Sequence, residues 1–465
     1  MDSKLTTAEV PAPSRNPCWP QRRREALAIL AIGGPLIIHN LALMGMQFTD
    51  TLMAGRLGAG TLAAVAVGAN VWSPVFLFLL GILMALSPTA AHLHGAGRHR
   101  EIGRYVRQMA WLSLLLAALG WLALWHAAVF LRAIHIEPPI IPTAAAYLRA
   151  MAWGLPGVCL YQVLRFTSEA IAHTKPMLVI AVGALVVNAI LDYVLMYGKL
   201  GMPALGAVGT GYASAISMWC MFLMLFVYVR RRGIYKSFEI FSHFEWPDRR
   251  VHGELLWLGL PIAISIFMEV TLFSGVGLMM GTLGTDIVAA HQIALNFCSI
   301  AFMIPMSLGF AISVRVGQAL GRGDPRGARQ AGITGIALCA GFEVFSALSM
   351  LLFPRWIVGV YTRDPRVIPI AVGLLYMGAI FQLSDGLQAS AAGALRGYKD
   401  TRTPMLITIV AYWLVGFPLA WLFGIPLHLG PQMIWAGFIA GLSVAAVLLL
   451  LRFLRFSRVA VCNSA

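Results

Sequence analysis

Five acidic residues lie inside long apolar stretches of this 465-residue chain, where carboxylates are rare. An ionised carboxylate is costly in hydrocarbon, so such residues usually face a protein interior or a water-filled path and have a function. No lysine lies in the middle of these stretches, so the carboxylates need mobile cations as partners. Protons, sodium ions and organic cations all qualify, and competition between two of them for one carboxylate is the simplest basis for exchange. The five residues are Asp50, Asp192, Glu269, Glu343 and Asp385.

One group of polar residues in the first half has the composition of a cation site. The sequence NAILD places Asn188 and Asp192 one helical turn apart on the same helix face. Thr210 follows in the next apolar stretch, and Asp50 lies in the first. Carboxylate, amide and hydroxyl oxygens are ligands that hard cations accept. We therefore expect these four residues to form an all-oxygen cation pocket.

The composition of the chain indicates that these residues lie in membrane-spanning helices. Hydrophobic residues make up 59% of the chain and charged residues 11%, whereas a soluble domain carries about 25% charged residues. Apolar stretches long enough for a spanning helix of about 20 residues recur along the chain. We predict an all-α polytopic membrane protein with about twelve transmembrane helices. Their expected cores are 26–51, 60–88, 106–130, 141–171, 176–197, 206–230, 253–280, 286–316, 328–352, 367–393, 404–425 and 432–456.

The basic residues predict the orientation of these helices. Although the net charge is +15, arginine and lysine gather in alternate loops, as the positive-inside rule describes, and no nucleic-acid partner is needed to explain them. We predict a multi-pass protein with both termini in the cytoplasm. The expected divisions are a cytoplasmic arm 1–25, an N-lobe 26–230, a cytoplasmic linker 231–252, a C-lobe 253–456 and a cytoplasmic tail 457–465.

The two lobes are internal repeats. A shift of 226 residues superposes the segment that begins at Pro35 on the segment that begins at Pro261 without a gap. Each repeat has six helices, so both enter the membrane from the same side, a plan in which transporters bind substrate between the repeats. The shift pairs Glu269 with Leu43, and Asp50 with Val276. The lobes are therefore expected to be chemically distinct.

Several motifs carry a resemblance to a known family. MGMQFTDTLMAG, MEVTLFSGVGLMMGTLG, VAAHQIALNF, FMIPMSLGFAISVRVGQALGRGD and AAGALRGYKDT resemble the multidrug and toxic compound extrusion (MATE) family, in its bacterial NorM-type branch. The resemblance covers about residues 27–454. It implies export of cationic amphipathic drugs and dyes across the bacterial inner membrane, driven by inward Na+ or H+, without a cofactor.

The resemblance also implies two cation-coupling and substrate-binding sites. The second-lobe site falls on Glu269 and Asp385, and the first-lobe site falls on Asp50, Asn188, Asp192 and Thr210. Na+, if it is the coupling ion, would bind at one of them. Many relatives have tyrosine where this chain has Phe381, so one possible hydroxyl ligand is absent here. Weaker candidates are Gln292, Phe381, Asp364 and Glu343.

Three other functions fit the sequence less well than drug antiport. A lipid-linked oligosaccharide flippase is the main alternative, but its anionic pyrophosphate substrate needs cationic residues in the membrane, and the mid-membrane charges here are acidic. A membrane enzyme would need a catalytic motif such as HExxH or GxSxG, and the sequence contains neither. A passive channel suits two chemically distinct repeats less well than exchange does. We expect the chain to act as a monomer in the lipid bilayer, and the sequence does not decide between Na+ and H+.

Overall fold

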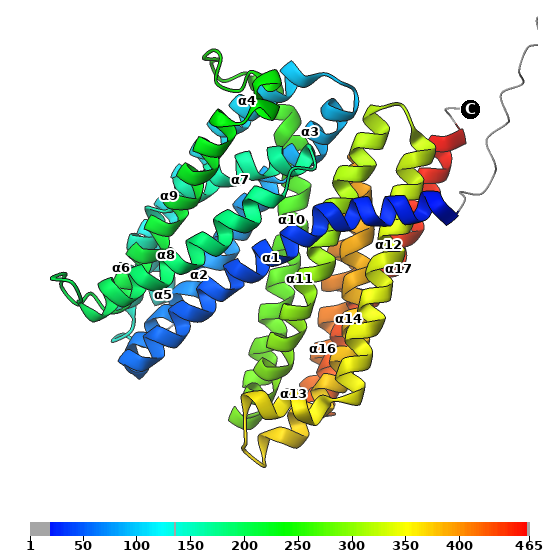
Figure 1. The fold of residues 1–465 in the computed structure, drawn as a ribbon. Helices are drawn as coiled ribbons and strands as arrows, with labels where there is room; N and C mark the ends of the chain where they lie inside the picture. Colours follow the sequence, from blue (N-terminus) through cyan, green and yellow to red (C-terminus); the bar gives the residue numbers. More distant parts are fainter. Residues whose placement is uncertain (1–18, 134–135, 463–465) are drawn as a thin grey trace, which may run out of the picture.

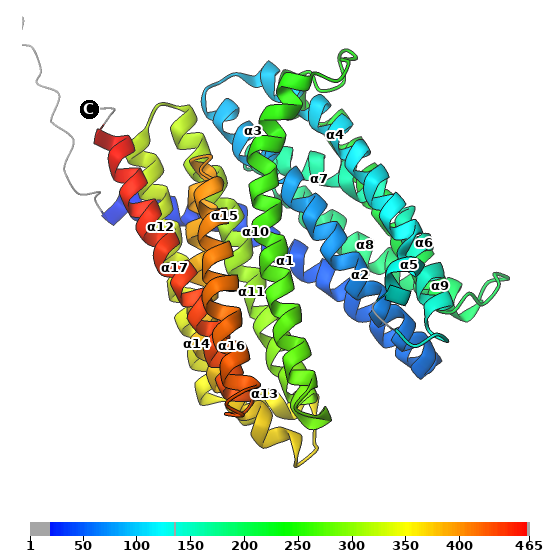
Figure 2. The same cartoon turned by 180° about the vertical axis from the view of Figure 1, so that it is seen from behind.

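The structure, a computed structural model, describes residues 19–133 and 136–462. The predicted arm and tail lie partly beyond it, because residues 1–18 and 463–465 are outside the described residues. Within that range the chain forms two helical lobes that lie side by side (Figures 1 and 2). The all-α, two-lobed membrane fold expected from the sequence is confirmed.

The first lobe holds nine helices and the second lobe the remaining ones, with a short linker between them. The N-lobe helices are α1 (Trp19–Leu57), α2 (Ala59–Leu83), α3 (Leu86–Gly95), α4 (His99–Trp125), α5 (Ala127–Ala133), α6 (Ile141–Ala152), α7 (Leu155–Ala170), α8 (Lys175–Tyr197) and α9 (Ala207–Arg231). The linker contains the 3-10 helix η1 (Gly233–Phe238). The C-lobe helices are α10 (Arg249–Gly281), α11 (Thr285–Gly321), α12 (Pro325–Leu352), α13 (Pro354–Tyr361), α14 (Val367–Gly397), α15 (Arg402–Ile409), the π-helix η2 (Val410–Gly416), α16 (Phe417–Gly424) and α17 (Pro431–Cys462).

One predicted span is divided into two helices, neither of which is long enough to cross a membrane. The described residues contain 11 helices that are long and apolar enough to cross a membrane, and the expected span 141–171 is not among them. It is divided into α6, of 12 residues, and α7, of 16 residues, each too short to span alone. Pro156 in the first turn of α7 has no N–H to continue the α6 hydrogen bonds. The prediction of one continuous helix here was wrong, although the two pieces together supply the missing span.

Another predicted span, 404–425, changes its winding in the middle. It consists of α15, η2 and α16, and η2 is a π-helix of seven residues. Pro418 follows directly in the first turn of α16, where its missing N–H leaves the carbonyl of residue 414 without its usual α-helical donor. Wider π turns occur often at functional sites. This one carries Tyr412 into the interior of the C-lobe.

The first helix of each repeat crosses to the opposite lobe. The N-terminal part of α1 packs on α11, where Asn40 Nδ2 donates to Ser307 Oγ at 2.9 Å, and its C-terminal part packs on α8. Helix α10 packs on α2 of the N-lobe in the same manner. In Figures 1 and 2, α1 runs from beside α12 in the C-lobe to the far end of the N-lobe. These two helices tie the lobes together.

The interface between the lobes follows the sequence repeat. A Cβ built on Gly33 would meet Leu308, and a Cβ built on Gly259 would meet Ile82. The 226-residue shift relates Gly33 to Gly259 and Ile82 to Leu308, so the two contacts are symmetry equivalents. A third contact, between Gly317 and Ala91, joins two positions that the same shift relates to each other. The interface is thus a two-fold contact in which a surface meets its own copy.

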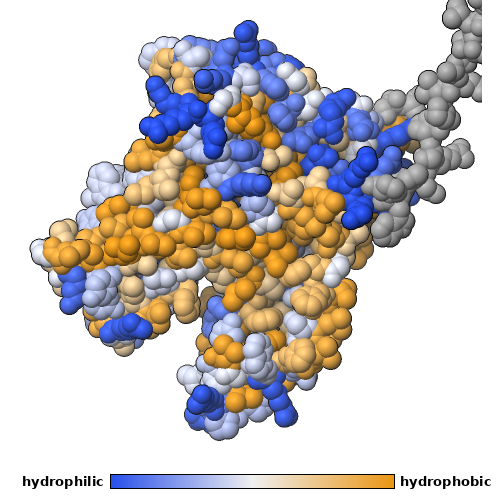
Figure 3. Space-filling view, in the orientation of Figure 1, coloured by the Kyte–Doolittle hydropathy of each residue, from blue (hydrophilic) through white to orange (hydrophobic). Residues whose placement is uncertain are grey.

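The lobes meet at the end that carries most of the basic residues and diverge at the other end. At the basic end, α3 packs on α11, His92 Nε2 lies 2.7 Å from the Gly397 carbonyl, and Gln318 Nε2 donates to the Ala170 carbonyl at 2.8 Å. The space-filling view shows an open notch between the lobes at the opposite end (Figure 3). A band of hydrophobic side chains crosses the middle of that surface.

We expect bulk at the symmetric glycine contact to weaken the joined end. Gly259→Val places methyl groups against the backbone of Ile82, and overpacking of this kind costs about 1–3 kcal/mol. Gly341→Val is the matched control, because a Cβ there meets nothing within 4 Å. Thermal unfolding of the purified variants should show a lower midpoint for Gly259→Val than for Gly341→Val. Equal midpoints would mean that the contact is not tight.

Candidate cation sites

Three helices position the N-lobe polar residues. Asp50 lies in the C-terminal half of α1, Asn188 and Asp192 lie on α8, and Thr210 lies near the start of α9. Helix α8 ends at Gly198, which has a left-handed φ of 66° and so terminates the helix where a side chain would be strained. The chain then returns through a short loop into α9. Because of this hairpin, α9, which carries Thr210, packs along α8.

Of the four N-lobe residues expected to form a pocket, Asp50, Asn188 and Asp192 lie together in the interior, and Thr210 is buried on α9. Asn188, Asp192 and Thr210 are fully buried, and Asp50 is 7% exposed. Asp50 interacts with both Asp192 and Asn188. Their buried oxygens without hydrogen-bond partners in the described structure are Asp50 Oδ1, Asn188 Oδ1, both carboxylate oxygens of Asp192 and Thr210 Oγ1. Buried polar atoms are almost always satisfied, so these oxygens are candidates for a ligand that supplies the missing interactions.

Two further residues complete this cluster, and the sequence reasoning missed both. Ser214 Oγ on α9 donates to Asp50 Oδ2 at 3.1 Å. Tyr147 on α6 is buried, and it lies close enough to Asp50 and Asp192 to interact electrostatically with both carboxylates. The signal for Ser214 was its position one helical turn after Thr210. Tyr147 gave no such signal, because the break between α6 and α7 that sets its position was not foreseen.

In the C-lobe, Glu269 and Asp385 approach each other from α10 and α14. Their charges interact, and Asp385 is 3% exposed whereas Glu269 is only partly buried. Gln388, one turn after Asp385 on α14, donates from Nε2 to Glu269 Oε2 at 3.5 Å. Asp385 Oδ1 has no hydrogen-bond partner in the described structure. The two residues named from the sequence thus form one acidic group.

Glu343 joins the same group from α12. Its side chain is fully buried, and its charge also interacts with Asp385. It occupies space that exists because residue 386 is glycine: a Cβ there would collide with the Glu343 carboxyl group. Gln382, on the same side of α14, is buried and interacts with the Glu343 carboxyl group. The structure therefore brings three carboxylates together from α10, α12 and α14. Asp385, on α14, interacts with both of the others.

The C-lobe group also contains a tyrosine that was not expected. Tyr412 on η2 is fully buried, and the charges of Glu269 and Asp385 act on it. Its hydroxyl group has no hydrogen-bond partner by distance and angle in the described structure. Among the described residues, no three His, Cys, Asp or Glu side chains converge closely enough to hold a metal ion. A bound Na+ would therefore depend on amide and hydroxyl oxygens as well as carboxylates.

Phe381 lies apart from this chemistry, in an aromatic cluster of the C-lobe core. Its ring contacts Phe273, Trp435 and Phe438, with ring centres 5.2–5.9 Å apart, and it is 1% exposed. Trp435 in turn donates from Nε1 to His291 Nδ1 at 3.1 Å. Phe381 therefore packs in the C-lobe core, one helical turn before Asp385 on α14.

Two weaker candidates lie at the surface. Gln292 is exposed on α11. Asp364 precedes α14, where its carboxylate accepts from the Arg366 backbone N–H at 2.9 Å and pairs with the Arg366 side chain at 3.4 Å. These hydrogen bonds hold the pKa of Asp364 below its ordinary value. Asp364 is 21 residues before Asp385, roughly 30 Å along a helix, so the structure does not bring them together.

Two arginines lie deeper than the sequence indicated. Arg165 on α7 is buried and pairs with Glu169 at 2.6 Å. Arg396, expected in a basic loop, is in the last turn of α14, and its charge interacts with Glu269. The two guanidinium groups lie 5.6 Å and 5.4 Å from the ring centre of Phe310 on α11. This group lies between the lobes at the joined end.

The sequence matches known proteins along most of its length. The MatE family model matches residues 35–194 and again 261–422, and these starting points have the same 226-residue offset as the internal repeat. Multidrug resistance protein PmpM of Pseudomonas aeruginosa is 42% identical over 441 residues, which cover 94% of this chain and 92% of that protein. Multidrug resistance protein MdtK of Yersinia pseudotuberculosis is 42% identical over 433 residues, covering 92% and 95%.

A solved structure shares the fold. An outward-facing multidrug resistance MATE family transporter of the MOP superfamily superposes with a TM-score of 0.86 at 19% identity, over 94% of this chain and 96% of that one. The likeness covers both lobes. With the repeated family match and relatives at 42% identity, it shows that the chain belongs to the MatE family, the multidrug and toxic compound extrusion transporters.

Proposed function

We propose that this chain exports cationic amphipathic drugs and dyes in exchange for Na+ or H+. The observation that carries the proposal is the N-lobe cluster, where five buried oxygens have no hydrogen-bond partner among the described residues and two of the side chains are carboxylates. A desolvated carboxylate without a cationic partner is strongly unfavourable, so the cluster requires a cation that can come and go. Relatives named multidrug resistance proteins support drugs as the exported cargo.

Exchange follows from competition and a change of access. In the form seen here, the lobes are apart at the end away from the basic residues; if that end is periplasmic, as the positive-inside rule predicts, an entering ion reaches the carboxylates from there. The ion neutralises a carboxylate, weakens drug binding and favours the state open to the other side. It can do so only by binding one state more tightly than the other. For the protein to open toward the cytoplasm, the contacts around Phe310 that join the lobes must separate.

The lipid-linked oligosaccharide flippase is the less favoured alternative. A pyrophosphate would need cationic side chains along the path, whereas the buried groups within each lobe are acidic. Arg165 and Arg396 lie between the lobes at the closed end, and Arg165 is already paired with Glu169. We therefore place the chain in the bacterial inner membrane as a cation-exchanging monomer with cytoplasmic termini. It is a transporter without enzymatic activity, and it needs no cofactor.

The experiment that tests this function uses inverted membrane vesicles. A fluorescent cationic dye is added, and an imposed Na+ gradient and an imposed pH gradient are applied in separate runs. We expect one gradient to drive dye movement by wild-type protein, and that gradient identifies the coupling ion. If neither gradient moves the cation, the antiport proposal is wrong, and flipping of a fluorescent lipid-linked sugar becomes the activity to measure.

A further inference from the structure

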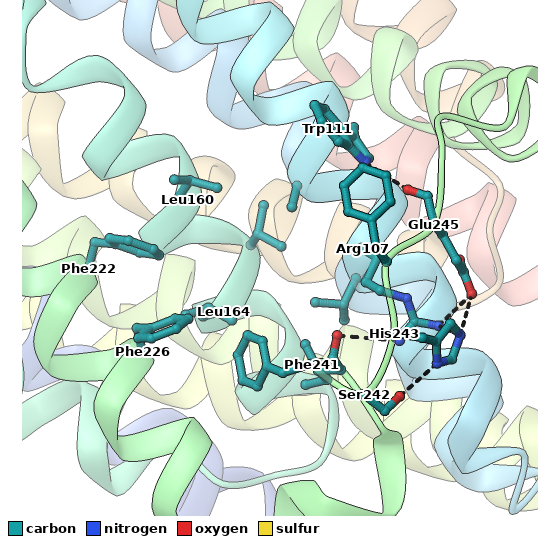
Figure 4. Close-up of a pocket in the computed structure, with 15 residues that line it drawn as sticks. Arg107, Trp111, Leu160, Leu164, Phe222, Phe226, Phe241, Ser242, His243 and Glu245 are labelled. Carbon is teal, nitrogen blue, oxygen red and sulfur yellow. Dashed lines mark hydrogen bonds and ion pairs between the residues drawn. The ribbon is translucent and has the colours of Figure 1, made fainter.

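A groove on the outer surface of the N-lobe lies outside both acidic clusters. It encloses about 580 Å³ between α4 and α9, with α7 as its floor, and linker residues 240–245 close one end (Figure 4). The lining is mainly apolar. In Figure 4, Phe222 and Phe226 of α9 and Leu160 and Leu164 of α7 face it, and Trp111 and Phe241 lie across from them. The volume is within the range of small-molecule sites.

The groove opens on a surface that faces lipid. Leu223 and Val227 on α9 are 52% and 42% exposed, and Leu114 and Leu115 on α4 are 40% and 58% exposed. Exposed leucine and valine on both walls indicate contact with hydrocarbon. If the groove were empty, the side chains that line it would lose dispersion contacts. An acyl chain from the surrounding lipid would restore these contacts, so we expect it to fill the groove.

The linker that closes the groove lies at the membrane interface. Phe241, Phe244 and Trp246 are 43%, 66% and 78% exposed, and exposed aromatic residues beside basic loops are typical of the headgroup level. Helix α4 holds the linker in place: Gln108 Nε2 donates to the Trp246 carbonyl at 2.9 Å, and Trp111 Nε1 donates to the Glu245 carbonyl at 3.0 Å. The groove below the linker is therefore at acyl-chain depth.

The charges at the mouth of the groove do not favour a cationic ligand. Arg107 Nη2 donates to Glu245 Oε1 at 2.6 Å, and His243 Nε2 lies 3.0 Å from the same oxygen. The hydrogen bond from Arg107 lowers the pKa of Glu245, which stays ionised and paired. The one carboxylate at the mouth is thus already neutralised within the protein.

An unpaired cation lies at the basic end of one wall. Phe222, Phe226 and Arg230 are spaced four residues apart, so they lie along one stripe of α9. Arg230 is exposed and belongs to none of the ion pairs in the described part of the chain. A chain lying on the two phenylalanines would bring its headgroup to this guanidinium. Basic residues at this level attract anionic lipid headgroups.

We propose that the groove binds one anionic phospholipid of the leaflet at the basic end, with an acyl chain along Phe222 and Phe226 and its phosphate at Arg230. The lipid fills the space under the linker that joins the lobes. The site is independent of the exchange reaction, because it shares no residue with either acidic cluster.

Native mass spectrometry of the purified full-length protein tests the proposal, with phosphatidylglycerol and phosphatidylcholine of identical chains as probes. Wild-type protein should retain phosphatidylglycerol in preference to phosphatidylcholine. Ala110→Phe fills the groove and should remove retention of both lipids, whereas Ala118→Phe, the same change on an exposed part of α4, should not. Arg230→Gln should lower the preference for phosphatidylglycerol about fivefold, the effect of one basic residue, whereas exposed Arg326→Gln should not.

Each contrary outcome overturns a stated part of the proposal. If Ala110→Phe and Ala118→Phe retain lipid equally, the bound lipid is elsewhere and the groove assignment is wrong. If wild-type protein retains both lipids equally, the anionic specificity is wrong. Leu160→Trp, which fills the groove from its floor, replaces Ala110→Phe if that variant does not fold.

Discussion

Asp385→Asn reduces gradient-driven dye efflux by about 5- to 150-fold, which corresponds to losing the 1–3 kcal/mol by which two linked ligands typically affect each other. Asp385 interacts with both Glu269 and Glu343, so its removal interrupts the whole C-lobe acidic group. The amide keeps the volume of the side chain but cannot become an anion. We expect Glu269→Gln to have a similar effect, because its charge acts at the same group.

The same variant should fold, which separates loss of exchange from loss of structure. Asp385 Oδ1 has no hydrogen-bond partner in the described structure, so replacing the carboxylate removes an unfavourable buried charge and little else. Its thermal midpoint should equal or exceed that of wild-type protein. Asp286→Asn is the control, since Asp286 lies in the first turn of α11 with a half-buried side chain. Efflux by Asp385→Asn at the control rate would exclude the C-lobe group from coupling.

Asp192→Asn should abolish ion-dependent stabilisation of the protein and should reduce transport, again by about 5- to 150-fold. Asp192 contributes two of the unpaired oxygens in its cluster and lies beside Asp50. A ligand that binds only the folded protein raises its unfolding free energy in proportion to the logarithm of ligand concentration. Thermal unfolding over a series of Na+ concentrations, balanced with K+, measures that increase directly.

Further variants distinguish the loss of a charge at Asp192 from the loss of a neutral oxygen in the same cluster. Thr210→Val removes one neutral oxygen at nearly constant shape, so we expect a loss of about fivefold, the equivalent of one hydrogen bond. Glu101→Gln should change nothing, because Glu101 is half-buried in α4 and pairs with Arg98 rather than with any residue of the cluster. Transport by Asp192→Asn that equals that of Thr210→Val would show that the charge of Asp192 is not used. Stabilisation that depends on pH but not on Na+ would identify the proton as the ion at this site.

The sequence by itself determined the membrane class, the two repeats and the principal charged residues. These features depend on properties that are local or periodic in the sequence. Apolar stretches indicate the spans, and the 226-residue offset indicates the lobes. A carboxylate in an apolar stretch can be identified without knowledge of the fold. Asn188 and Asp192 were expected to lie together because four residues make about one helical turn. The family match at the same offset agrees with the repeat.

Only the tertiary structure decided which distant residues meet. Glu343 looked isolated in the sequence, and its place beside Asp385 depends on a glycine at position 386 of another helix. Tyr147 and Tyr412 reach the clusters through a helix break and a π turn, which hydropathy does not report. Arg396, which looked like a loop residue, lies between the lobes because α14 continues to Gly397. Hydropathy specifies that a segment is buried in the membrane, whereas packing specifies which face of it meets which partner.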